Sequence, residues 1–151
     1  MRAVFVLGRA IFGGYFAWSG LNHFLEEKQL SQYAAAKGVA APDVAVTGSG
    51  ALLLAGGLSV MTGVKPRQGL AAIVAFLIPV SMQMHRFWEV DDPQQRMNDM
   101  INFTKNMALA GAALMMMQLD EPWPASIDVA RREGEEMYVR VGGRDLRGLP
   151  A

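Results

Sequence analysis

The chain has two histidines, His23 and His85, and each lies at the end of a long apolar segment. A neutral imidazole can both donate and accept hydrogen bonds, and its proton exchanges near neutral pH. The pair could therefore bind a polar head group, such as the carbonyls of a quinone, or could hydrogen-bond a loop in a structural role. It could also ligate haem or, together with Asp91 or Asp92, a metal ion. Nothing else in the sequence supports haem or a metal, so the first two interpretations are favoured and haem is disfavoured.

Four further polar residues lie in or beside the same apolar segments. Ser19 and Asn22 precede His23, whereas Lys105 and Asn106 begin the last segment. Together with the histidines they form the candidate ligand-binding set: Ser19, Asn22, His23, His85, Lys105 and Asn106. No catalytic residue and no metal ligand is assigned.

Arg9 lies inside the first apolar segment, where an ionisable side chain is costly unless it has a partner or a cavity. It is about 21 Å from His23 along a helix axis, at roughly 1.5 Å per residue. We therefore expect Arg9 near the opposite, inner face of a membrane. Its side chain could extend to the lipid headgroups, or turn inward to a carbonyl or a bound anionic group.

Four apolar segments must position these residues. They cover residues 3–25, 44–64, 68–84 and 107–119, the last extending toward Ile101 if Lys105 reaches the headgroups. A membrane-spanning helix needs about 20 mostly apolar residues, and soluble helices carry a polar face that these segments lack. The sequence therefore predicts an all-α, polytopic membrane four-helix bundle over residues 1–119, followed by a soluble tail over residues 120–151.

Four spans would place both termini on one side of the membrane. The first and third helices would then run outward and the fourth would return, so His23, His85 and Asn106 would share the outer face. The basic tail and the turn at 65–67 favour cytoplasmic termini under the positive-inside rule. Trp88 and Trp123 follow the third and fourth segments closely, as expected of interfacial anchors.

Smaller elements are predicted between and after the spans. Residues 29–37 have the spacing of a short amphipathic helix on the membrane surface, and residues 87–98 read as an acidic loop. Pro79 should kink the third helix, because it removes the hydrogen bond to the carbonyl of Ala75. In the tail we expect one short helix over residues 126–136 and a hairpin that pairs 137–141 with 144–149 across two glycines.

The composition excludes several functions. Hydrophobic residues make up 52% of the chain and the formal net charge is +0, whereas a nucleic-acid partner would require a concentrated basic surface. The sequence contains no cysteine, which excludes disulfides, thiolate chemistry and iron–sulfur clusters.

Several short motifs resemble one known family. Arg9 followed by the sequence SGLNHF over residues 19–24, the Gly56-Gly57 pair, HRFW over 85–88 and FTKNMAL over 103–109 are similar, in this order, to DoxX-type membrane proteins. The resemblance covers roughly residues 3–119. It implies a four-helix protein integral to the bacterial cytoplasmic (inner) membrane. The matching positions that carry over are Arg9, Ser19, Gly20, His23, His85, Lys105 and Asn106.

Relatives of this type are named as the small subunit of a terminal quinol oxidase or of a thiosulfate:quinone oxidoreductase, and some associate with redox-stress enzymes. The resemblance thus implies an accessory subunit of a quinone-linked or redox-stress system, with a polar pocket at the outer face. Its partners would be the lipid bilayer and oxidoreductase subunits or a second copy of the chain. The alternative is a non-catalytic membrane scaffold whose tail recruits a cytoplasmic partner.

Overall fold

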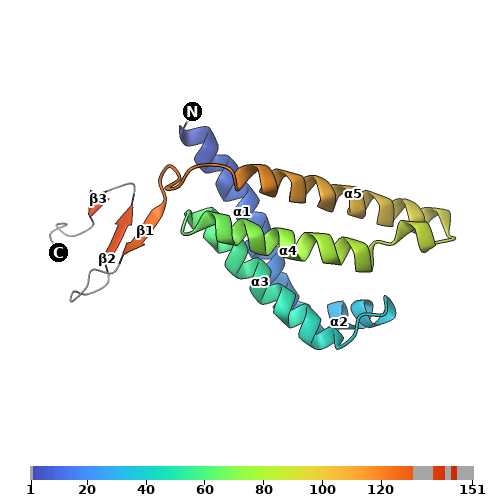
Figure 1. The fold of residues 1–151 in the computed structure, drawn as a ribbon. Coiled ribbons are helices and arrows are strands. Elements are labelled where there is room, and N and C mark those ends of the chain that lie inside the picture. Colours follow the sequence, from blue (N-terminus) through green and yellow to red (C-terminus); the bar gives the residue numbers. More distant parts are fainter. Residues whose placement is uncertain (1, 131–137, 142–143, 146–151) are drawn as a thin grey trace.

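A computed structural model of the 151-residue chain describes residues 2–130, 138–141 and 144–145. The described part begins with four α-helices, a short 3-10 helix and a fifth α-helix, and ends in three strands (Figure 1). In chain order these are α1 (Arg2–Leu25), α2 (Glu27–Ala36), α3 (Pro42–Thr62), α4 (Pro66–Met84), η1 (Phe87–Glu89), α5 (Pro93–Met116), β1 (Ile127–Ala130), β2 (Tyr138–Val141) and β3 (Arg144–Asp145).

Helix α1 is apolar on two opposite sides, and only one of them packs against protein. Its inner side buries Phe16 and Ala17 between glycines. Its outer side is a continuous exposed stripe at helical spacing: Val4, Leu7, Ile11, Tyr15 and Trp18. A soluble helix would expose polar side chains there, so this side of α1 faces lipid.

Helices α1 and α3 pack antiparallel at close range. A Cβ atom added to Gly57 would lie 2.6 Å from the Gly13 carbonyl oxygen, and one added to Gly20 would lie 2.7 Å from the Gly50 carbonyl oxygen. Each of these positions can therefore hold only glycine without moving the helices apart. Helices in lipid associate through such small-residue contacts because dispersion and backbone proximity, not hydrophobicity, drive their packing.

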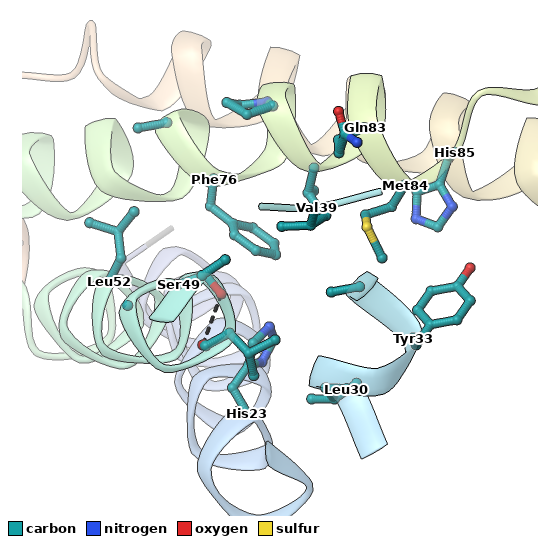
Figure 2. A pocket seen from close by; sticks show the side chains of 17 residues that line it. His23, Leu30, Tyr33, Val39, Ser49, Leu52, Phe76, Gln83, Met84 and His85 are labelled. Carbon is teal, nitrogen blue, oxygen red and sulfur yellow. Dashed lines mark hydrogen bonds between the residues drawn. The ribbon is translucent and has the colours of Figure 1, made fainter. Parts of the chain in front are cut away.

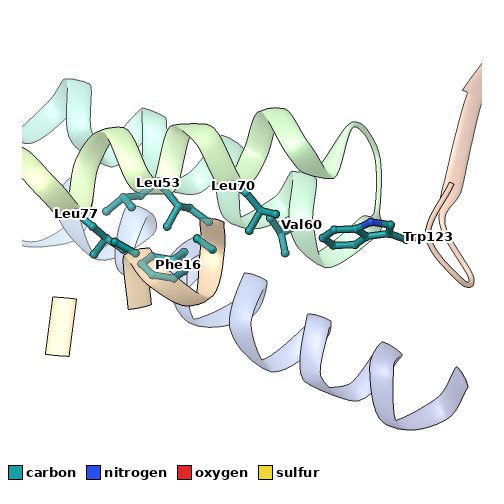
Figure 3. Packing of buried hydrophobic residues seen from close by; sticks show 9 residues of the cluster. Phe16, Leu53, Val60, Leu70, Leu77 and Trp123 are labelled. Atoms are coloured by element: carbon teal, nitrogen blue, oxygen red, sulfur yellow. The ribbon is translucent and has the colours of Figure 1, made fainter. Parts of the chain in front are cut away.

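Helices α3 and α4 form an antiparallel hairpin across the turn at 65–67 and supply most of the core. Helix α3 ends at Thr62 and is capped by Gly63, with φ of 76°, and α4 begins at Pro66 after Lys65, whose φ is 47°. The fixed φ of proline suits the first turn of a helix, where its missing N–H has no partner to lose. Their core side chains Leu53, Val60 and Leu70 have no exposed surface (Figure 3), and neither does Ile73 in the same cluster.

Helix α5 begins earlier than the sequence indicated. Residues 87–98 were expected to form a loop, but Asp92 caps a helix that starts at Pro93, and its carboxylate accepts a 2.7 Å hydrogen bond from the Gln95 N–H. Aspartate at the cap and proline at the first position are strong helix-start signals. The prediction of a loop was therefore wrong beyond Asp92, and α5 runs beside α4 (Figure 1).

Three of the five α-helices in the described residues are long and apolar enough to cross a membrane: α1, α3, and α4 with the residues that follow it to Glu89. The chain is therefore an α-helical integral membrane protein. The short α2 (Glu27–Ala36) accounts for one more helix than the four predicted, and it lies where the amphipathic surface helix was expected, over residues 29–37. Helix α5 is not one of these three, because its first half is polar.

The tail contains a small antiparallel sheet in the order β1-β2-β3, so the predicted all-α class applies to the helical region only. Ile127 pairs with Val141, and Val141 in turn pairs with Arg144. The predicted helix over 126–136 is wrong at 127–130, which form β1; isoleucine and valine there favour extended structure and a partner strand is present. Residues 131–137 lie outside the described part, as do Gly142 and Gly143 of the predicted hairpin.

The segment between α5 and β1 returns to the helices. Trp123 is only 3% exposed, and its ring stands edge-on to Phe5 with centroids 5.4 Å apart. It joins Val60 and Leu70 in the core cluster (Figure 3). The expectation that Trp123 is an interfacial anchor is therefore corrected: a turn after α5 folds the ring inward, where it buries a large apolar surface. Trp88 is half-exposed.

Candidate functional site

A cavity of about 540 Å³ lies between the ends of α1 and α4 and the facing sides of α2 and α3 (Figure 2). Its wall is mainly apolar, with Leu30 from α2, Leu52 from α3, and Phe76 and Met84 from α4. His23 reaches the cavity from α1. The structure therefore brings the two histidines, from helices far apart in sequence, to one apolar pocket.

His23 is held in place by its own helix and by a glycine of α3. Its Nδ1 atom lies 2.7 Å from the Ser19 carbonyl oxygen, one turn earlier. A Cβ atom on Gly50 would lie 2.7 Å from the His23 Cβ, so only glycine there leaves room for the histidine. The imidazole then meets Phe76 edge to face, with centroids 5.9 Å apart. These contacts fix the ring with its Nδ1 toward the protein.

His85 is the residue directly after α4, and a buried carboxylate orients its ring. Its Nδ1 lies 3.2 Å from Asp99 Oδ1, and the second oxygen of Asp99 accepts a 3.0 Å hydrogen bond from the Lys37 ammonium. Asp99 is only 4% exposed. The three side chains thereby connect the end of α2, the end of α4 and the polar first half of α5.

The carboxyl of Asp99 is ionised in this network. Burial alone would raise its pKa, but the hydrogen bonds from Lys37 and His85 and the charge of the Lys37 ammonium outweigh burial and hold the pKa below its ordinary value of 3.8. A histidine whose Nδ1 bonds to a carboxylate is fixed in tautomer and orientation. Asp99 therefore positions His85 at the pocket.

Asp99 was not among the candidate residues predicted from the sequence, although a signal was present. The buried residues of α5 are Asp99, Asn106, Ala110 and Ala113. They lie seven, four and three residues apart, which places them on one face of the helix. A carboxylate on the same stripe as small core residues has to be buried and therefore paired. That periodicity could have identified it.

Other polar groups at the pocket are already bonded to backbone carbonyls. Gln83 donates from Nε2 to the Lys37 carbonyl at 3.1 Å, and Ser49 donates to the Val46 carbonyl at 3.0 Å. Pro79 and Ala75 both line the pocket. Because proline has no N–H, the Ala75 carbonyl lacks the helical partner it would otherwise have.

A second, more polar cavity of about 370 Å³ shares Gln83 with the first. Lys37, Arg86 and Glu89 line it, and Arg86 and Glu89 form a 3.0 Å ion pair. The apolar pocket is thus flanked by a charged one at the end of α4.

The remaining candidates do not line the pocket. Ser19 contributes only its carbonyl, and Asn22 lies one position before His23 without contributing to the wall. Lys105 is exposed and donates to the side chain of Asn102. Asn106 is buried on the inner stripe of α5. The predicted grouping of Asn106 with the two histidines is therefore not what the structure shows, because α5 faces α4 and not the pocket.

Arg9 lies at the other end of α1 and turns inward. It is only 5% exposed, and its guanidinium donates to the Pro124 and Ala125 carbonyls at 3.1 and 3.2 Å and to the Ser126 hydroxyl at 3.3 Å. Of the two alternatives, the structure has the inward carbonyl-bound form. A Cβ atom on Gly63 would lie 2.6 Å from Arg9 Nη1, so this end of α3 also makes room for the guanidinium.

No group of three or more His, Cys, Asp or Glu side chains suited to a metal ion occurs within residues 2–130, 138–141 and 144–145.

One comparison with known proteins gives a match. A family model described as DoxX matches residues 4–86, which run from the first turn of α1 through α4 and include His85. Helix α5 and the tail lie beyond the matched region. No curated protein and no solved structure matches the chain.

Proposed function

The chain belongs to the DoxX family and is an integral membrane protein, and from this premise we propose that it is an accessory subunit of a quinone-linked or redox-stress oxidoreductase system. In this proposal the pocket of His23 and His85 holds the ring of a lipid-soluble quinone-type molecule. A bacterial inner membrane is the proposed location.

One observation supports the proposal most strongly: two imidazoles from different helices meet at one apolar cavity. Its volume of about 540 Å³ lies within the usual range for small-molecule sites, roughly 300–1,000 Å³. Such sites combine apolar walls with a few placed polar groups. The ring of a quinone-type molecule, apolar on its faces and polar at two opposite oxygens, has this same distribution.

His23 and His85 would bind and orient the ring, and Asp99 would hold His85 in position. A bound quinone would supply two-electron redox chemistry. The remaining subunits of the system would deliver or remove those electrons, so this chain is proposed as a binding subunit and no catalytic residue is assigned to it.

We also propose that the last apolar segment, 107–119 extended to Ile101, is a fourth span formed mainly by α5, so that Asp99 lies outside it, and that both termini are cytoplasmic. The hydrogen bonds from Arg9 to residues 124–126 support an even number of crossings, because they join the start of α1 to the chain that follows α5. Reporter fusions at position 35 and after residue 151 test the orientation. A cytoplasmic reporter at position 35 would reverse it.

Purified protein tests the quinone proposal directly. Organic extraction of the protein, isolated from native membranes in mild detergent, should yield quinone at close to one molecule per chain. His23→Phe and His85→Phe should lower this yield severalfold, whereas Lys105→Ala, an exposed change away from the pocket, should leave it unaltered. Extracts without quinone from both the wild type and Lys105→Ala would refute the proposal.

A second candidate function is a scaffold whose tail recruits a cytoplasmic partner. The fixed attachment of the tail favours it, since Trp123 packs in the core and Arg9 binds Ser126. The same contacts extend the proposed membrane domain from residue 119 to Ser126. Truncation after Ser126 keeps them, and loss of a co-purifying protein with retained quinone would support the scaffold. A truncated chain that keeps every partner would refute it.

A further inference from the structure

We infer that the pocket of His23 and His85 selects a neutral ligand that donates hydrogen bonds, and therefore binds the reduced, dihydroxy form of a quinone-type ring in preference to the oxidised form. This inference rests on the proposed function, because it concerns the ligand of the same pocket. It adds which redox form is held, and it involves binding only.

The Ser19 carbonyl determines which nitrogen of the His23 ring donates and which accepts a hydrogen bond. A backbone carbonyl only accepts hydrogen bonds, so the 2.7 Å contact with Ser19 requires a proton on His23 Nδ1. A neutral imidazole has a single N–H. Its Nε2 therefore presents a lone pair, which is an acceptor.

The same reasoning applies to His85. Asp99 is ionised and accepts hydrogen bonds at both oxygens, one of them from the Lys37 ammonium. In the neutral form of the His85 ring, the proton must then lie on Nδ1, which leaves Nε2 as an acceptor. Neither Nε2 atom has a hydrogen-bond partner within the described residues.

Three further groups at the pocket have acceptor capacity to spare. Gln83 uses its amide nitrogen on the Lys37 carbonyl and keeps its oxygen, and Ser49 uses its proton on the Val46 carbonyl. Pro79 leaves the Ala75 carbonyl without a helical donor. Against these acceptors stand two side-chain donors, the Tyr33 hydroxyl and the second amide hydrogen of Gln83. The wall is therefore rich in acceptors.

The pocket also favours a neutral ligand. None of its 17 lining side chains is Lys, Arg, Asp or Glu, and an unpaired charge in an apolar site carries a large desolvation penalty. A hydroquinone is neutral and offers two O–H groups to the two Nε2 atoms. A quinone offers two carbonyl oxygens, which would face lone pairs and leave both imidazoles unsatisfied.

Binding measurements on the full chain in detergent test the inference. The probes are a short-chain benzoquinone, its hydroquinone kept reduced under argon, and the dimethyl ether of that hydroquinone, titrated by calorimetry at pH 8. The hydroquinone should bind roughly 10- to 30-fold more tightly than the quinone, as two added neutral hydrogen bonds imply. The dimethyl ether, which has the ring but no donor, should bind no better than the quinone.

The outcomes separate the two proposals. Binding of the quinone that equals or exceeds binding of the hydroquinone would overturn the inference and leave the proposed function standing. Absence of binding by either form would overturn both. Lys105→Ala, an exposed change away from the pocket, should leave hydroquinone affinity unchanged, whereas His23→Phe should reduce it about fivefold.

A spectroscopic measurement does not depend on how the variants fold. Nitrogen NMR of the wild-type protein labelled at histidine should show the proton on Nδ1 in both neutral rings, His23 and His85, before any ligand is added. Addition of the hydroquinone should shift both Nε2 signals. A proton on Nε2 in both rings would overturn the inference.

Discussion

Replacement of Asp99 by alanine should destabilise the protein more than any other change of an acidic residue in the helical region. The Asp99 carboxylate lies 3.0 Å from Lys37 Nζ and 3.2 Å from His85 Nδ1, and its side chain is only 5% exposed. Asp99→Ala would leave the Lys37 ammonium and the His85 Nδ1–H without an acceptor. Breaking a buried pair in this way typically lowers the free energy of unfolding by about 3–5 kcal/mol.

The value for this site should be somewhat smaller. The Lys37 side chain is 18% exposed, so its ammonium can recover part of its hydration once the carboxylate is gone. The substitution also removes the free-energy cost of burying the Asp99 carboxylate, which offsets part of the lost stability. We therefore expect Asp99→Ala to lower the free energy of unfolding by about 2–4 kcal/mol.

Equilibrium unfolding in mixed micelles, followed by circular dichroism, measures this free energy. Asp91→Ala is the matched control, because Asp91 is an exposed aspartate just before α5, and it should change the free energy by less than about 0.5 kcal/mol. In the double variant that combines Lys37→Met with Asp99→Ala, no charge of this pair is left unpaired; the single variants of the cycle are Lys37→Met and Asp99→Ala. Its destabilisation should therefore be smaller than the sum of the single changes by about 1–3 kcal/mol.

Two results would refute this reasoning. One is an Asp99→Ala protein as stable as the Asp91→Ala control. The other is strict additivity of the two single changes, which would mean that Lys37 and Asp99 do not interact in the folded protein.

Three further predictions follow from other contacts. Gly57→Ala should lower the thermal midpoint in detergent, because overpacking of this kind typically costs about 1–3 kcal/mol. Gly111→Ala is the control: its added Cβ meets nothing within 4 Å, so it should not lower the midpoint. Equal midpoints for the two variants would contradict the close contact between α1 and α3. Arg9→Met should shift the fluorescence of Trp123, in a variant where it is the only tryptophan, to longer wavelength, because three hydrogen bonds that hold the following residues are lost; an unshifted spectrum would contradict that role. Because the pKa of Asp99 is lowered in the folded protein, its ionisation stabilises the fold fully above the ordinary value of 3.8, and this contribution disappears as the pH falls through the folded pKa. Thermal midpoints measured from pH 7 to 3 should therefore fall more steeply at the acid end in the wild type than in Asp99→Asn. Parallel curves for the two proteins would contradict this prediction.

Much of the helical region could be predicted from local patterns. The apolar segments 44–64 and 68–84 became α3 and α4 within two residues at either end, because composition and length set a spanning helix. The start of α5 was missed although Asp92 and Pro93 are start signals, because the polar residues that follow were read as a loop. Strand β1 was missed because four residues adopt extended structure only when a partner strand is beside them, which no local pattern reveals.

The candidate site was predicted only in part. The sequence placed His23 and His85 at helix ends facing one side of the membrane, and both line one pocket. Asn106 was assigned to the same place because it has the right depth in the membrane. Depth follows from counting residues, but the direction in which a side chain points depends on rotation of the helix about its axis, about 100° per residue. That rotation is set by packing, and it turns Asn106 toward the core.

The sequence by itself determined that this chain lies in a membrane and that its ionisable groups there are few. Both conclusions follow from composition and segment length, which act through the transfer of side chains from water and need no knowledge of neighbours. The tertiary structure alone decided the partners: the carboxylate of Asp99 for His85, the carbonyls after Trp123 for Arg9, and the shared pocket of the two histidines. Such pairings join residues distant along the chain, so they depend on how the helices dock and not on any local spacing.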